Sequence, residues 1–427
     1  MRLLMRAWMI SDMTRTLIRN ATIFDGTGAD PYRGDILMED GLFRAVGPGM
    51  PADGAEVVDA TGRFAIPGLI DCHVHATLFG DEGLLTYARM GVTTVKDLGG
   101  QFDAVLALRQ RQRDGGAPGA RALIVGTFVE GDPASWGALG SAMEVNRSEE
   151  DVDRTIERAL DAGVDGIKLY AALPPALVRR AITRIAGAVP VTGHLMATKA
   201  SEAVAARIGG LEHLQLTPYR DLVPPEHGFG PGDVMSDPGY WGKVRRGWEA
   251  IDPEAAAPLI AAMREAGTVM VPTLVLGART ERSFTAEEEA AFTAAQRPVL
   301  EVQRAVLATQ EPPDLERSAA NMLAVVRAMH AAGVPVLPGT DCGAVGVPPG
   351  YGLHIELGLM AKAMPAREVL LAATGQAARW LRRDDIGTIA AGKRADCVLL
   401  EADPMQDITN TRRIAAAYMD GERVVAA

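Results

Sequence analysis

Two histidines stand two residues apart at the end of an apolar run, in the stretch "GLIDCHVH" at residues 68–75. Side chains two positions apart on a strand point to the same face. His73 and His75 can therefore bind one metal ion together, because imidazole suits zinc and similar divalent ions. An isolated His-x-His pair is a weak signal, so the prediction depends on what the rest of the chain supplies.

Three further residues of metal-binding type lie at or near the ends of later apolar segments. His194 ends "VPVTGH", His213 lies in "LEHLQL", and Asp341 ends "VPVLPGTD". The two histidines could hold a second ion, and the carboxylate can both bind a metal and act as an acid or base. The joint pattern predicts a metal centre more strongly than any one motif does.

Lys168, in "GIKLY", is the unusual member of this set. An ammonium group that points at metal ions would be repelled, and a lysine among cations and apolar walls has a lowered pKa. A neutral amine can add carbon dioxide to give a carbamate, whose two oxygens could bridge two metals. The hypothesis is that Lys168 is a carboxylated bridging ligand; the alternative is a lysine paired with a nearby carboxylate.

These residues need a frame that brings distant segments to one place. Short apolar segments alternate with helical stretches from about residue 66. Near-continuous apolar strands joined by helices predict a parallel sheet covered by helices. Eight such units predict an α/β fold, a (β/α)8 TIM-like barrel, whose catalytic groups gather at the carboxyl ends of the strands. The predicted strands are 68–74, 91–99, 122–129, 166–170, 189–194, 211–216, 269–276 and 334–341.

One helix has a clear start and stop, in "SEEDVDRTIERALDAG" at residues 148–163. Ser148 and Asp151 have the spacing of a capping box. Gly163 is suited to the position just after the helix ends. The sequence therefore predicts a helix between these signals.

Short β segments flank the barrel region on both sides. Residues 15–66 mix β-branched residues with turns at Asp25-Gly26, Asp40-Gly41 and Thr61-Gly62, and strand patterns return after residue 383. We expect a small composite β-sandwich domain built from both termini. The predicted division is 1–66 for its N-terminal part, 67–383 for the barrel and 384–427 for its C-terminal part, with residues 1–12 as a loose extension.

Composition limits the partners. The 427 residues carry a formal charge of −11, which disfavours nucleic acid or an anionic membrane as a general partner. The sequence contains no run of 18 apolar residues and no continuous apolar leader segment, so we expect neither a membrane span nor a signal peptide. Three cysteines without C-x-x-C spacing fit a reducing, cytoplasmic location. A homo-oligomer is left open.

The full set of residues resembles the amidohydrolase superfamily in its binuclear, carboxylated-lysine subtype. "PGLIDCHVH" is similar to its opening motif, and "IGTIAAGKRADCVLLEADP" is similar to its closing segment. "GIKLY" and "GHLMATKASEAVAARIGGLEHL" resemble the prolidase-like members, relatives of imidazolonepropionase and ochratoxin-cleaving amidases. The resemblance implies two divalent metal ions, with zinc expected. Their ligands would be His73, His75, carboxylated Lys168, His194, His213 and Asp341.

The resemblance also implies a reaction. A hydroxide held by the metals would attack an amide or peptide-like C–N bond in a small molecule, such as a dipeptide or N-acyl amino acid. Asp341 would be the catalytic base and then the acid. Four residues are candidates for substrate binding: Tyr170, Tyr219, Arg220 and His354. The region after the third strand, "GTFVEGDPASWGALGSA", lacks the histidines that many prolidase-like members have there, which leaves the substrate open.

Three alternatives remain at this point. The same site could serve a cyclic amidohydrolase or a lactonase. A mononuclear deaminase usually has a glutamate close after the fifth-strand histidine, whereas "LMATKAS" follows His194 here. A non-catalytic scaffold of this fold would typically lose metal ligands, and this chain keeps all six.

Overall fold

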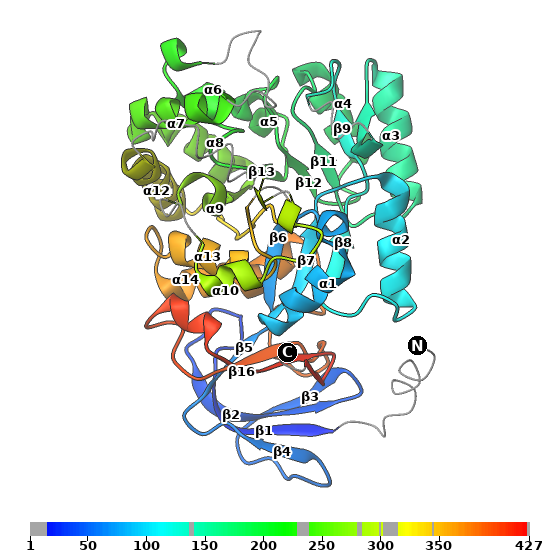
Figure 1. Ribbon diagram of the computed structural model, residues 1–427, viewed down its shortest axis with the longest axis vertical. Coiled ribbons are helices and arrows are strands. Elements are labelled where there is room, and N and C mark those ends of the chain that lie inside the picture. The colour runs from blue at the N-terminus through cyan, green and yellow to red at the C-terminus, as the bar shows by residue number, and fades with distance from the viewer. Residues whose placement is uncertain are drawn as a thin grey trace.

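The computed structural model describes residues 15–135, 141–228, 239–279, 284–298, 300–301, 315–343 and 346–424. Figure 1 shows strands from both halves of the chain gathered at one end of the molecule, and helices surrounding shorter strands in the rest. The loose extension predicted for residues 1–12 lies outside the described residues. None of the helices in the described part is long and apolar enough to cross a membrane.

The terminal segments form one sheet of eight strands. The β-branched residues predicted as strands pair here, and β15 runs antiparallel to β5, which joins the two ends of the sequence. Both termini therefore contribute to one β unit, as expected. The described strands form a single sheet, however, so a two-layered sandwich is not confirmed. The strands are β1 (Thr16–Ile23), β2 (Tyr32–Glu39), β3 (Leu42–Gly47), β4 (Glu56–Asp59), β5 (Phe64–Pro67), β15 (Cys397–Leu400), β16 (Ile414–Met419) and β17 (Glu422–Val424).

The tight turns of this sheet follow from residues that accept positive φ. Asp40 and Gly41 have φ values of 52° and 76° and join β2 to β3. Asp420 and Gly421, with φ values of 49° and 76°, join β16 to β17. Asp-Gly is the preferred pair for hairpin turns with two left-handed residues.

The middle of the chain supplies parallel strands in two ladders. One has the order β6-β7-β8 and the other β10-β9-β11-β12-β13-β14. Isolated parallel bridges connect Met270 of β14 to Val336 and Val74 of β6 to Cys342. This order is consistent with a (β/α)8 barrel, although the described strands do not close into one ring. They are β6 (Leu69–Val74), β7 (Val92–Asp97), β8 (Arg121–Ile124), β9 (Phe128–Glu130), β10 (Met143–Val145), β11 (Ile167–Leu169), β12 (Val191–Gly193), β13 (Gly210–Glu212) and β14 (Val269–Val271).

Four predicted strands differ from the structure. The predicted strand 211–216 ends early, because β13 stops at Glu212 and His213 has a φ of 59°. The predicted strand 122–129 divides into β8 and β9 around Gly126, whose φ is 83°. The strand 269–276 ends early at Val271, because Pro272 and a left-handed Thr273 interrupt it. The segment 334–341 makes only isolated bridges. Its two prolines, Pro335 and Pro338, lack the N–H groups that a ladder needs.

Helices connect the strands and surround them in Figure 1. The capping box predicted at Ser148 and Asp151 is confirmed at the start of α3, and Gly163 follows its end with a φ of 68°. The described helices are α1 (Ala76–Arg89), α2 (Phe102–Arg113), α3 (Glu149–Asp161), α4 (Pro175–Ile185), α5 (Ala200–Ala205), α6 (Tyr219–Leu222), α7 (Tyr240–Ala250), α8 (Ala257–Ala266), α9 (Leu274–Gly277), α10 (Ala286–Ala290), α12 (Leu315–Ala331), α13 (Tyr351–Met360), α14 (Ala366–Leu371) and α15 (Ala377–Trp380).

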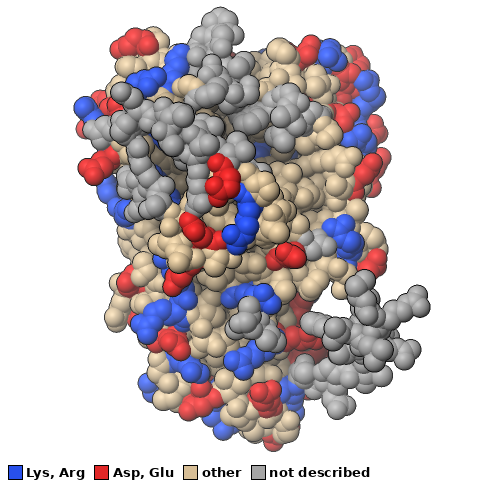
Figure 2. All heavy atoms as spheres, viewed as in Figure 1, with Lys and Arg blue, Asp and Glu red and all other residues tan. Residues whose placement is uncertain are grey.

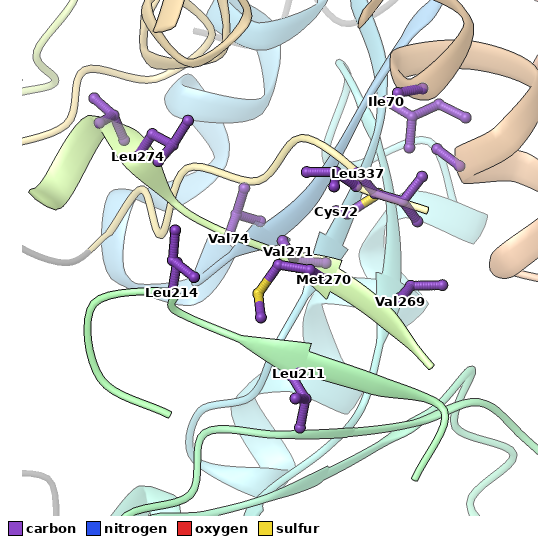
Figure 3. Close-up of a cluster of buried hydrophobic side chains, with 14 of the residues drawn as sticks. Ile70, Cys72, Val74, Leu211, Leu214, Val269, Met270, Val271, Leu274 and Leu337 are labelled. Carbon is purple, nitrogen blue, oxygen red and sulfur yellow. The ribbon is translucent and has the colours of Figure 1, made fainter. Parts of the chain in front are cut away.

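The core explains why a buried strand ends in histidines. Every residue of β6 is buried, so both of its faces are covered by protein. Ile70, Cys72 and Val74 alternate along it and belong to the apolar cluster of Figure 3, with side chains from β13 and β14. The alternate positions of the strand carry Asp71 and His73 on the opposite face. The pleat therefore separates packing residues from polar ones.

The charged side chains are mixed in sign on the face shown in Figure 2, where basic and acidic groups of the described residues alternate with tan areas.

Candidate metal centre

The six residues selected from the sequence come from five separate places in the chain. His73 lies on β6, Lys168 on β11 (Ile167–Leu169), and the other four follow directly after β6, β12, β13 or the segment 334–340. Parallel strands have their carboxyl ends at the same edge, so these positions meet. The four histidines and the lysine are buried, whereas the Asp341 side chain keeps 13% of its surface exposed.

Short contacts link the members of this cluster. Asp341 Oδ1 lies 3.2 Å from His73 Nε2 and 3.1 Å from His75 Nε2. Lys168 Nζ lies 3.4 Å from His73 Nε2. The His213 ring centroid is 4.5 Å from that of His73. Ligand atoms of His73, His213 and Asp341 all lie within 4.8 Å of one another, a spacing that can surround a metal ion.

His194 completes the cluster from β12. Its ring centroid lies 4.4 Å from that of His213. Its Nε2 atom is buried and has no hydrogen-bond partner among the described residues. A buried nitrogen without a partner costs free energy unless something else satisfies it, and a metal ion would.

The Nδ1 atoms of the other three histidines each face a protein acceptor. His73 Nδ1 lies 2.7 Å from Glu212 Oε2, and His75 Nδ1 lies 2.7 Å from the carbonyl of Gly99. His213 Nδ1 lies 2.9 Å from Thr273 Oγ1. Carboxylate and carbonyl oxygens only accept, so His73 and His75 donate their Nδ1 protons. This is the arrangement usually found around metal-binding histidines.

These tautomers leave a conflict that a cation resolves. With its proton on Nδ1, a neutral imidazole has a bare electron pair on Nε2. The Nε2 atoms of His73 and His75 would then both face Asp341 Oδ1, so three acceptors would point at one another. A divalent metal ion placed among them turns this repulsion into coordination, and the residues fit that role.

Electrostatics agree with this interpretation. Burial, together with the neighbouring cationic groups, holds the pKa of His194 and of His213 well below its ordinary value. Burial alone would lower the pKa of His73 as well, but Glu212 and Asp341 raise it. Burial would raise the pKa of Asp341, but the histidines hold it well below its usual range.

Glu212 is a functional candidate that sequence reasoning missed. Its side chain is fully buried, and besides His73 it accepts a hydrogen bond from Thr192 Oγ1 at 2.5 Å. Burial opposes its charge, yet the neighbouring His73 holds the pKa of the carboxyl below its ordinary value. The signal available was an acidic residue directly before His213 in a strand that is otherwise apolar.

Asp71 is a second missed residue, and it joins the first and last strand segments. Its Oδ1 accepts from the backbone N–H groups of His73 and Thr340, and its Oδ2 accepts from Thr340 Oγ1. Thr340 directly precedes Asp341. Asp71 therefore fixes the backbone on both sides of the short Asp341–His73 contact.

Two aromatic rings flank Lys168. Its Nζ lies 5.0 Å from the Phe128 ring centroid and 5.3 Å from that of Tyr170. The two rings stack at 4.6 Å, and Tyr170 meets the His194 ring edge-on at 5.0 Å. Burial lowers the pKa of Lys168 and raises that of Tyr170. Of the residues chosen for substrate binding, Tyr170 is thus beside the cluster.

Two of the other substrate candidates support loops. Tyr219 is fully buried and donates to the carbonyls of His227 and Lys243. Arg220 donates from Nη1 to the carbonyls of Met196 and Ala197, shortly after His194. Their roles in substrate binding remain predictions.

His354 lies at a different place. It is buried, with Nδ1 2.9 Å from Thr411 Oγ1 and Nε2 2.9 Å from the carbonyl of Met90. Met90 ends α1, whereas His75 precedes the start of that helix. Both ring nitrogens are occupied by protein groups at the far end of α1, so this geometry argues against the expected substrate contact.

Comparison with known proteins gives a family and a set of similar folds. A sequence profile of the Amidohydrolase family matches residues 64–424. The chain is 28% identical over 418 residues to a 5-methylthioadenosine/S-adenosylhomocysteine deaminase from Desulforudis audaxviator (strain MP104C), covering 90% of this chain and 84% of that protein. Other curated relatives match over short stretches, and the chain spans only 15% to 20% of their length.

Two solved structures are similar over almost the whole chain. A Xaa-Pro dipeptidase with bound methionine superposes with a TM-score of 0.70 at 20% identity, covering 96% of this chain and 99% of that chain. A bottromycin amidohydrolase superposes with a TM-score of 0.72 at 25% identity, covering 95% of this chain and 86% of that chain. The likeness to the dipeptidase shows a common fold and agrees with the prolidase-like resemblance of the sequence.

Proposed function

This chain belongs to the amidohydrolase family, whose members are hydrolases that act on C–N bonds, and on that premise we propose that it cleaves an amide or peptide-like bond with two divalent metal ions. Their ligands would be His73, His75, Lys168, His194, His213 and Asp341. The observation that carries the proposal is the convergence of the Nε2 atoms of His73 and His75 on Asp341 Oδ1, joined by the unpartnered Nε2 of His194. Zinc is the expected metal because imidazole and carboxylate suit it.

Lys168 is proposed to be carboxylated. Its Nζ is buried and forms no ion pair with any carboxylate in the described part of the chain, where its close polar neighbour is His73 Nε2 at 3.4 Å. This disfavours the alternative of a lysine paired with an acid. A neutral amine can form an N–C bond with carbon dioxide and release a proton, and the resulting anion would suit a position between two cations.

The proposal assigns a catalytic or positioning role to each residue around the metal site. Bound divalent ions supply a polarised carbonyl and a water of lowered pKa. Asp341, the one partly exposed member of the cluster, would accept a proton and pass it to the leaving nitrogen. Tyr170 borders the same space beside His194 and is the best-placed candidate for the developing oxyanion. Glu212 orients His73, and the Gly99 carbonyl orients His75.

A deaminase is the second candidate, because the match to the Desulforudis protein extends over 90% of this chain. The sequence after His194, "LMATKAS", still supplies no acid for that chemistry. The next acid, Glu202, accepts from the Lys199 backbone N–H at the start of α5 and is occupied there. A cyclic amidohydrolase or lactonase remains an alternative on the same site.

The test measures metal content and activity on the same preparations. Wild type, Lys168→Ala and Lys96→Met are purified with zinc and bicarbonate and analysed by plasma mass spectrometry. Lys96 is the matched control, since it is also a buried lysine of a parallel strand but its Nζ makes no hydrogen bond to any of the six residues. We expect about two metals per chain in wild type and the control, and fewer in Lys168→Ala.

Activity is assayed on Xaa-Pro dipeptides, N-acyl amino acids, cyclic amides, lactones and S-adenosylhomocysteine. Release of an amino acid from a linear amide supports the proposal. One metal per chain that Lys168→Ala does not change would contradict the bridging role. Deamination without amide cleavage would replace the proposal with the second candidate.

The finer architecture is also proposed. We infer that residues 67–383 form a (β/α)8 barrel and that residues 1–66 and 384–427 together form a β-sandwich. The bridges at Val336 and Cys342 support the first inference, and the pairing of β15 with β5 supports the second.

All three cysteines are buried and unpaired, which supports the proposal of a cytoplasmic location.

A further inference from the structure

Thr273 occupies an unusual backbone position between β14 and α9. Its φ and ψ are 47° and 51°, in the left-handed region that a β-branched residue rarely adopts. The residue is fully buried, and Pro272 precedes it. Such a conformation persists only where the surroundings impose it, and it often marks a functional position.

Thr273 stands where a threonine normally caps a helix, but it does not do so. As the residue before α9, it could accept from the first N–H groups of that helix with its own hydroxyl. No such hydrogen bond forms. Its Oγ1 lies instead 2.9 Å from His213 Nδ1, which leaves Nε2 as the ring nitrogen that could bind a metal.

Glu356 takes over the capping. This fully buried residue of α13 accepts from the backbone N–H of Leu274 at 3.0 Å and of Val275 at 2.7 Å. These are the first two residues of α9. A helix start leaves such donors without partners inside the helix, so the carboxylate satisfies them and fixes where α9 begins.

The backbone around His213 is held from the same side. The His213 N–H donates to the carbonyl of Val271 at 2.9 Å, and the Leu214 N–H donates to the carbonyl of Pro272 at 3.1 Å. The His213 φ is itself 59°. Main chain and ring therefore both depend on the segment from Val271 to Thr273.

We propose that Glu356 is a positioning residue that acts through Thr273 on His213. By capping α9, Glu356 holds Thr273 in the left-handed conformation and releases its hydroxyl to orient the imidazole. The inference rests on the proposed function, because it treats His213 as a metal ligand. It predicts that two side chains outside the metal cluster set the metal affinity.

The test uses the full chain, which is stripped of metal and then titrated with Co²⁺. Three quantities are measured: the dissociation constant for Co²⁺, the visible Co²⁺ spectrum and the melting temperature of the apoprotein. Thr273→Val removes the hydroxyl while keeping the shape, and Thr273→Ser keeps the hydroxyl. We expect Thr273→Val to bind Co²⁺ about 10- to 100-fold more weakly, with an altered spectrum. Thr273→Ser should remain near wild type.

Thr268→Val is the matched control. Thr268 is equally buried, just before β14, and its hydroxyl donates to the carbonyl of Ile208 at 2.7 Å, away from the metal cluster. This variant should lower the melting temperature without changing Co²⁺ affinity. A merely structural role for Thr273 would give the same result as this control and would overturn the proposal.

A further set of variants tests whether Glu356 affects His213 through Thr273: Glu356→Gln, Glu356→Asp and the double variant Thr273→Val/Glu356→Gln. If Glu356 acts through Thr273, the double variant binds Co²⁺ no more weakly than Thr273→Val alone. If the two substitutions each weaken Co²⁺ binding and their effects multiply in the double variant, Glu356 does not act through Thr273. Glu356→Asp replaces Glu356→Gln in this comparison if the glutamine variant does not fold. Failure of wild type itself to bind Co²⁺ would refute the proposed function, whereas normal binding by Thr273→Val would refute only this inference.

Discussion

Lys96 is a second buried lysine in the parallel strands, and it has no hydrogen-bond partner for Nζ among the described residues. It lies on β7, with Nζ 3.9 Å from the ring centroid of Trp380. Burial lowers the pKa of its ammonium to about 8, although Glu212 acts in the opposite direction. Below that pH the folded protein must carry a buried charge that no hydrogen bond stabilises.

Lys96→Met is therefore expected to stabilise the apoprotein most at neutral pH. Between about 8 and the ordinary 10.5, the unfolded chain binds more protons than the folded one, so wild-type stability rises with pH. At about 1.4 kcal/mol per pH unit, the advantage of the variant in the free energy of unfolding should shrink by about 3 kcal/mol from pH 7 to pH 10.5.

The measurement is urea unfolding of both proteins across this pH range, with Lys362→Met as an exposed control. A pH-independent difference for Lys96→Met would show that the amine is not destabilised by burial.

At the scale of single residues, the sequence predicted which residue types form the metal cluster, but not which residues they contact. His73, His75, His194 and His213 could be chosen because each sits at or near the end of an apolar segment. Glu212 could not be chosen in the same way. Its role depends on which face of β13 meets His73, and the two residues are 139 positions apart.

At the scale of elements, α13 is tied to α1 through a neutral histidine. His354 is buried between Thr411 and the carbonyl that ends α1. Burial lowers the pKa of this imidazole to about 4. The folded state therefore keeps the ring neutral through most of the mildly acidic range.

His354→Gln is expected to reduce the loss of stability in acid. Between the ordinary value of 6.5 and about 4, the unfolded chain binds more protons, so wild-type stability falls as the pH falls. Over that interval wild type should lose about 3 kcal/mol more than the variant, at about 1.4 kcal/mol per pH unit.

The experiment compares urea unfolding of the two apoproteins at pH 6.5, 5.5 and 4.5. His330→Gln, on the half-buried end of α12, is the control for losing one histidine. Parallel declines in wild type and His354→Gln would mean that His354 is protonated in the folded protein without cost.

The predicted elements agreed with the structure where local signals were strong. The α3 capping box is one example, since Ser148 and Asp151 make both of its hydrogen bonds within four residues. The boundary at Val271 could not be predicted in the same way. A run such as "VMVPTLVL" has strand composition throughout, and Glu356, 82 residues beyond Leu274, determines where α9 begins.

At the scale of the whole molecule, the partly buried Arg121 joins the parallel strands to the terminal sheet. Arg121, at the start of β8, bonds Asp396 Oδ2 at 2.9 Å and Asp420 Oδ1 at 3.1 Å. Asp396 is almost fully buried and also accepts from the backbone N–H of Asp420. Arg121 thus reaches two separate parts of the C-terminal region.

Arg121→Met is expected to destabilise the protein by about 3–5 kcal/mol, because it leaves the buried Asp396 charge without its partner. Arg44→Met is the control: Arg44 pairs with Glu39 and Asp40 on the surface, where such pairs contribute at most about 1 kcal/mol. Urea unfolding at pH 7 measures both. Equal effects would contradict a special role for Arg121, and Asp396→Asn added to Arg121→Met should recover part of the loss.

The division of the chain at residues 66 and 383 was predicted from a change in pattern, and it remains a prediction. What the pattern could show was that β segments occur at both ends. Their pairing in one sheet and the contact through Arg121 depend on side chains 275 and 299 positions apart. Local composition carries no information on such distances.

Because β15 pairs with β5, the terminal sheet can be completed only late in the synthesis of the chain. β5 ends at Pro67, and its partner begins at Cys397, so an edge of the N-terminal sheet has no partner while about 330 residues are being made. At roughly 5–20 residues per second, the wait is about 15–70 s. During that time the edge can pair with another nascent chain. The ribosome and its chaperones must therefore shield a strand whose proper neighbour has not yet been translated.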